Sequence, residues 1–193
     1  HIELPEDIAD EHTDSLPLKR SHSRRPNADV KSIREAVKAL EEAKSPVLVI
    51  GAGANRTMTG RMLLQFIEKT GIPFLTTQLG KGVIDERHPK FLGCAALSSG
   101  DFVHRAVEAS DCIVNLGHDV IEKPPFFMQR GGPTVIHVSS KTAEVDPVYF
   151  PDIEVIGDIA NAVWQMKEDI VPNGGWKFDH MLAFRKAEVE HTA

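Results

Sequence analysis

Residues 45–56 constrain the fold of this chain more than any other stretch. The run Val47–Ile50 is apolar and mostly β-branched, which is typical of a strand that is buried on both faces. It ends at Gly51-Ala52-Gly53, and a helical pattern follows over about residues 57–70. A strand, a glycine turn and a helix form the first unit of a doubly wound α/β domain. Ligands of such folds bind at the carboxyl ends of the strands, so this turn is the first candidate site.

The phosphate-binding fingerprint at this turn is incomplete. Gly-x-Gly-x-x-Gly requires a third glycine where this chain has Arg56. A nicotinamide-dependent enzyme would also carry an acidic residue at the end of the second strand, where this sequence has Thr76, Thr77 and Gln78. The sequence therefore favours a structural βα turn over a dinucleotide site.

Apolar runs alternate with helical patterns along the rest of the chain. Strands are predicted over 47–50, 72–76, 91–94, 112–117, 134–138 and 154–156. Helices are predicted over 29–43, from Asp101 onward and from Asp158 to Ile170, while segment 178–190 is expected to form a polar helix apart from the main core. Because the strands are apolar throughout, we predict a three-layer α/β/α Rossmann-like domain with a six-stranded parallel sheet.

The domain organisation follows from the same pattern. Residues 1–27 carry scattered prolines without lasting periodicity and are interpreted as a linker from a missing N-terminal domain. Residues 28–172 are the predicted central domain, and 173–193 are the predicted C-terminal linker towards a further missing domain. The first residue is not Met, so we expect the chain to be cut from a longer protein.

Composition excludes several function classes. A net charge of -6 argues against nucleic-acid binding, which needs a basic surface. No stretch of the sequence resembles a signal peptide, and no apolar run approaches the ~18 residues of a membrane span, so we expect a cytoplasmic protein without membrane contact. Cys94 and Cys112 lie in or beside apolar runs and are expected to be buried thiols rather than a disulfide.

No strong catalytic motif is present, and we predict no catalytic residue and no metal ligand. The nine histidines are scattered and none pairs at the spacing of a metal site. His137 lies inside a strand and is expected to be a core histidine. His118 follows Gly117 at the end of a strand; it either lines a cleft or, as we expect, is a loop residue without chemistry.

Three stretches together resemble a known family. Residues 45–54, 70–73 and 76–82 are similar to the central domain of thiamine diphosphate-dependent enzymes, and most similar to acetolactate synthase large subunits. Residues 1–7 resemble the end of that family's first, pyrimidine-binding domain, and residues 155–159 resemble the close of its central domain. The resemblance covers almost the whole chain and implies the same six-stranded parallel fold.

The resemblance also implies a function. The parent enzyme would be a carboligase of the transferase class that joins two pyruvates to 2-acetolactate with loss of CO₂, using thiamine diphosphate and Mg²⁺. The family's catalytic glutamate and its Gly-Asp-Gly site lie in the first and third domains. Gly157-Asp158 begins like Gly-Asp-Gly, but Ile159 replaces the second glycine, so Asp158 is expected to cap a helix. This chain would then be inactive alone, with the pyrimidine- and diphosphate-binding domains as its partners in a homodimer or homotetramer, and it would not reveal which keto acids react.

Many members of the family bind FAD in this domain. Seven residues match those FAD contacts: Arg24, Gly51, Ala52, Gly53, Thr77, Gln78 and Leu79. Other positions depart, because residues 95–97, 118–123 and 139–141 replace segments that include two arginines in the flavin-binding members. Losing both arginines removes two donors for an anionic ligand, and Asp119 and Glu122 lie nearby instead. We therefore expect no cofactor in this domain, as in the FAD-independent, catabolic branch. An independent nucleotide-binding module that uses the glycine turn and the 77–82 loop is the alternative.

Overall fold

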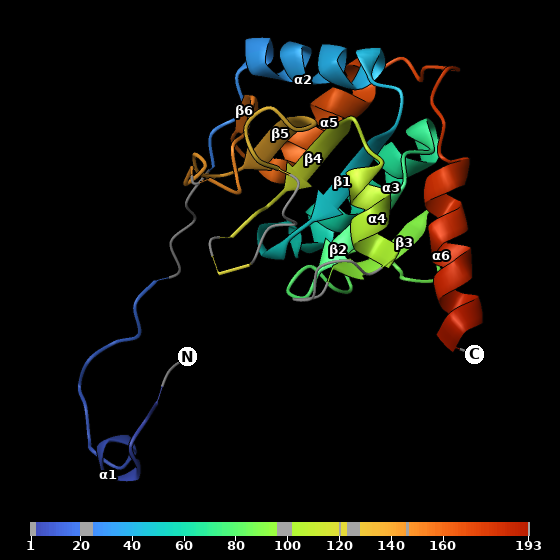
Figure 1. Ribbon diagram of the computed structural model, residues 1–193. Helices are drawn as coiled ribbons and strands as arrows, with labels where there is room; N and C mark the ends of the chain where they lie inside the picture. The colour runs from blue at the N-terminus through green and yellow to red at the C-terminus, as the bar shows by residue number, and fades with distance from the viewer. Residues whose placement is uncertain are drawn as a thin grey trace.

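The computed structural model describes residues 3–19, 25–95, 102–119, 121–122, 128–145 and 147–192. Its centre is a six-stranded sheet in which every strand pair is parallel (Figure 1). The strands are β1 (Pro46–Ile50), β2 (Phe74–Thr77), β3 (Phe91–Ala95), β4 (Cys112–Leu116), β5 (Thr134–Ser139) and β6 (Ile153–Ile156). The predicted α/β class, the strand number and the parallel arrangement are confirmed.

The order of the strands places a switch point beside the glycine turn. The sheet runs β3-β2-β1-β4-β5-β6, so the chain builds outward in one direction from β1 and then in the other from β4. Ile50 pairs with Leu116 at the carboxyl ends of these two strands. Such a switch point is where an open α/β sheet forms its ligand crevice.

One face of the sheet is covered by α2 (Val30–Glu42), α3 (Thr57–Thr70) and α5 (Ile159–Asp169). Alternate residues of the strands, such as Leu48 and Ile50, point into this core. The predicted end of α3 is confirmed, because Gly71 adopts a left-handed φ of 71° there. Val30 is 52% exposed, since it is the first residue of α2, one turn before the buried stripe begins.

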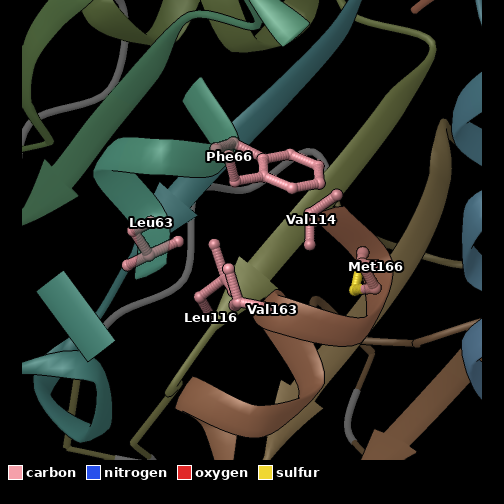
Figure 2. Close-up of a pocket in the computed structure, with 7 residues that line it drawn as sticks. Leu63, Phe66, Val114, Leu116, Val163 and Met166 are labelled. Atoms are coloured by element: carbon pink, nitrogen blue, oxygen red, sulfur yellow. The ribbon is translucent and has the colours of Figure 1, made fainter. Parts of the chain in front are cut away.

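The core on this face is closely packed. Side chains from β4, α3 and α5 point toward one another (Figure 2) and, together with Leu48 of β1, leave a void of only about 10 Å³. The lining is entirely apolar: Leu48, Leu63, Phe66, Val114, Leu116, Val163 and Met166. A space of this size and polarity holds no ligand and stays dry.

The opposite face is covered by α4 (Phe102–Glu108) and α6 (Asp179–Thr192). α6 packs against α4 and β3, and Met181 is fully buried in this second core. The segment before α6 is also fixed, because the Lys177 N–H donates to the Lys44 carbonyl at 2.9 Å. The expectation that 178–190 lies apart from the main core is therefore wrong: the short α4 leaves part of the sheet for α6 to cover.

The remaining segments carry little of the fold. Residues 3–19 are exposed, and α1 (Glu6–Ala9) within them buries no side chain. A 3₁₀ turn, η1 (Ala52–Ala54), follows β1. In the described part of the chain, no helix combines the length and the apolar character that a bilayer crossing requires. The boundaries at residues 27 and 172 stay predictions.

Candidate functional site

The glycines that follow β1 and β4 lie against each other at the switch point of the sheet. The Gly51 N–H donates to the Leu116 carbonyl and the Gly53 N–H donates to the Gly117 carbonyl, both at 2.8 Å. Gly117 has a left-handed φ of 69°, and a Cβ there would lie 2.3 Å from the Ala54 nitrogen. These glycines therefore allow one backbone segment to approach another, where a nucleotide-binding turn would let a diphosphate approach.

The side chain of Glu122 lies on the same turn. This carboxylate is only 6% exposed. Its Oε2 accepts a hydrogen bond of 3.0 Å from the Ala52 N–H, and its Oε1 accepts one from the Thr77 hydroxyl. The Thr77 Oγ1 in turn accepts from the Gly80 N–H at 3.1 Å. One carboxylate thus ties the end of β1 to the end of β2.

The structure brings four of the seven predicted cofactor contacts together. Gly51, Ala52 and Thr77 lie against the Glu122 carboxylate, and Gly53 lies beside Gly117 on the same turn. Gln78 and Leu79 follow β2 and are exposed, and Arg24 lies outside the described residues. Whether any of the seven contacts a ligand stays a prediction.

The donor set of this turn does not fit a flavin diphosphate. The Ala52 amide and the Thr77 hydroxyl already donate to a buried carboxylate. A second anion at this place would face that charge in a region of low dielectric, which is strongly unfavourable. The sequence placed an acidic residue in this neighbourhood, but it carried no signal for the contact itself, because residues 52 and 122 are joined only through the fold.

A second cluster lies where β4 and β5 end. It surrounds a cavity of about 130 Å³. The lining residues are His118, Asp119, His137, Ser139, Lys141, Thr142, Ala143 and Glu144. The first of the two interpretations of His118, a residue that lines a cleft, is the one that the structure supports. The mixed charges of this lining select no particular ligand.

His137 is a buried core histidine, as predicted. Its Nδ1 lies 2.6 Å from the Tyr149 hydroxyl and its Nε2 lies 3.0 Å from the Lys141 carbonyl. A carbonyl only accepts, so Nε2 carries the proton and Nδ1 accepts from Tyr149. Burial lowers the pKa of His137 below its usual value of 6.5, which keeps the ring neutral. Sequence reasoning missed Tyr149, the one tyrosine of the chain.

The remaining residues with chemical potential have structural roles. The Asp158 carboxylate accepts from the Asn161 N–H at 3.0 Å and caps α5, as predicted. It is thus used within the chain and does not fit a magnesium and diphosphate site. Neither cysteine forms a disulfide; Cys112 is buried, whereas Cys94 is only half-buried, contrary to expectation. Burial raises the pKa of the Cys112 thiol to about 12, so it is no nucleophile at neutral pH.

Known proteins share this fold and sequence pattern. Residues 33–166 match the family model for the central domain of thiamine pyrophosphate enzymes. An acetolactate synthase from Bacillus subtilis is 26% identical over 88% of this chain and 30% of its own length. A 2-hydroxyacyl-CoA lyase 1 from Dictyostelium discoideum is 32% identical over 72% of this chain and 24% of its own length.

A solved structure supports the same assignment at the level of the fold. It comes from Mycobacterium smegmatis and is described as a thiamin diphosphate-dependent enzyme. It superimposes with a TM-score of 0.66 at 24% identity, over 86% of this chain and 33% of the other. The chain thus spans about a third or less of the proteins that it matches. By the family match over most of its sheet and helices, the chain belongs to the central-domain family of thiamine pyrophosphate enzymes.

Proposed function

We propose that this chain is the non-catalytic central domain of an acetolactate synthase-like enzyme. The whole enzyme would convert two pyruvates and one proton into 2-acetolactate and CO₂, using thiamine diphosphate and Mg²⁺. The observation that carries the proposal is the alignment with the Bacillus subtilis acetolactate synthase, which extends over 88% of this chain.

The side chains of this domain support a structural role. His137 uses both ring nitrogens in internal hydrogen bonds, and Asp158 caps a helix. Within the residues that the structure describes, no three His, Cys, Asp or Glu side chains gather in a way that could hold a metal ion. Thiamine diphosphate and Mg²⁺ would therefore be held by the pyrimidine- and diphosphate-binding domains.

The domain would contribute architecture to a homodimer or homotetramer. Its two cores cover both faces of one sheet, so it forms a rigid unit between the two domains that carry the cofactor. The crevice at the switch point would then form part of the surroundings of the active site rather than the active site itself.

We further propose that this domain works without FAD. The Glu122 carboxylate holds the Ala52 amide, and the sequence lacks both arginines of the flavin-binding members. Losing two charge-assisted hydrogen bonds at about 1.5–3 kcal/mol each would weaken FAD binding by roughly a hundredfold to ten-thousandfold. The purified chain should be colourless and show no saturable FAD binding at micromolar concentration. A yellow preparation with stoichiometric flavin would contradict this.

The reaction is tested on the full-length product of the gene that encodes this chain. With pyruvate, thiamine diphosphate and Mg²⁺, it should form acetolactate at a rate that depends on both cofactors. A 2-hydroxyacyl-CoA serves as the competing substrate, because one similar protein is named for cleavage of such a compound. Cleavage of the acyl-CoA without acetolactate formation would overturn the proposed reaction while leaving the family intact.

A further inference from the structure

We propose that the Glu122 carboxylate is a built-in anion of the glycine turn. It fills the place at which a Rossmann-type turn holds a ligand phosphate, and the turn accepts a free small carboxylate only when this side chain is removed. The inference concerns the chain's own contacts and does not depend on the reaction proposed above.

The Glu122 carboxylate accepts a hydrogen bond at each of its two oxygens. Each oxygen receives its own donor, Oε2 from the Ala52 amide and Oε1 from the Thr77 hydroxyl. The donors come from two different strand ends, and the residue that they hold is only 6% exposed. A buried carboxylate without such partners would be strongly destabilising, so the two donors form a built site for one anion.

The backbone around the carboxylate leaves space for it only because the turn contains glycine. A Cβ on Gly51 would lie 2.6 Å from the Glu122 Oε2, so only glycine admits the carboxylate this close to the turn. The first glycine of the fingerprint therefore serves an internal anion. Gly53 and Gly117 pack directly against each other, since a Cβ on Gly53 would lie 3.0 Å from the Gly117 Cα.

Glu122 would compete with a bound dinucleotide for the same hydrogen-bond donors. A dinucleotide diphosphate would need the donors that Glu122 holds, and it would meet a negative charge beside them. The same donors would be left unsatisfied if the carboxylate were deleted. A free carboxylate of similar size, such as formate, would then bind in the vacated place.

The experiment is a chemical rescue followed by thermal unfolding of the 193-residue chain. Glu122→Ala should melt about 5–15 °C below the wild type, given the typical effect of lost charge-assisted hydrogen bonds on a chain of this size. Added formate, at an ionic strength held constant with chloride, should raise the melting temperature of this variant in a saturable way. Glu86→Ala, which removes an exposed carboxylate from a loop, is the matched control and should show no formate response, like the wild type.

Two results would overturn the proposal. One is a formate response of Glu122→Ala no larger than that of Glu86→Ala. The other is an unchanged rescue when Thr77→Val is added to Glu122→Ala, because this change removes the hydroxyl donor.

If Glu122→Ala does not fold, a second variant tests the hydrogen bond between Glu122 and the Ala52 amide. Glu122→Gln keeps the shape of the side chain and removes its charge. The amide proton of Ala52 should then move upfield in a ¹H–¹⁵N spectrum, because its acceptor is no longer a carboxylate. The Glu86→Gln control should leave that signal in place, and an unmoved Ala52 signal in Glu122→Gln would refute the role of Glu122.

Discussion

At the scale of single residues, Gly51 is required because a side chain would not fit there, and not because its backbone conformation is strained. The φ of Gly51 is -103°, which any residue can adopt. A Cβ at this position, however, would lie 2.6 Å from the Glu122 Oε2 and 2.8 Å from the Gly117 carbonyl oxygen. Crowding around a Cβ would therefore make this position sensitive to substitution.

The Gly51→Val variant should therefore lose about 1–3 kcal/mol or more of unfolding free energy. Urea unfolding measures the loss. Gly174→Ala is the control, because a Cβ at Gly174 meets nothing within 4 Å, and it should change stability by less than about 0.5 kcal/mol. Equal midpoints for Gly51→Val and the wild type would show that the turn is not closed by Glu122 and Gly117.

His137 predicts a pH dependence of stability. Burial lowers its folded pKa below the ordinary value of 6.5, so the unfolded chain binds the proton more readily. The stability contribution of His137 is thus fully present above about pH 6.5 and is lost as the pH falls towards its folded pKa. Urea midpoints measured from pH 7.5 down to about pH 5 should decrease, and His137→Gln should show a smaller decrease. Parallel profiles for the two proteins would contradict the buried, neutral histidine.

At the scale of secondary-structure elements, the strands and the inner helices were predictable because burial imposes their pattern. β1 and β4 are apolar at every position except Asn115, since helices cover both faces of the sheet. Caps such as Asp29 and Gly71 mark the ends of α2 and α3 by local chemistry. The contact of Glu122 with the turn was not predictable, because it joins residues distant in sequence.

α6 shows where periodicity fails as a guide. Its buried contacts are few and centre on Met181, so the helix has no continuous apolar stripe that a sequence pattern could reveal. Its packing depends on the part of the sheet that the seven-residue α4 leaves open.

Met181→Ala should therefore destabilise the chain by about 2–5 kcal/mol, as expected for a fully buried methionine. Val189→Ala, on the same helix but 49% exposed, is the matched control and should change stability by less than about 0.5 kcal/mol. Equal urea midpoints for the two variants would mean that α6 does not belong to the core.

At the scale of the whole molecule, the described part of the chain forms a scaffold of one sheet between two cores. The Glu122 carboxylate closes the glycine turn, and His137 at the end of β5 uses its ring in internal hydrogen bonds. The aligned part of this chain spans a third or less of each matched protein. In the function that we propose, the chemistry belongs to other domains of a longer enzyme.

The most direct test is an acetolactate assay on the purified 193-residue chain with pyruvate, thiamine diphosphate and Mg²⁺. We expect no acetolactate above a protein-free blank from chain whose folding has been checked by circular dichroism. Sustained acetolactate formation by this chain alone would contradict a non-catalytic central domain.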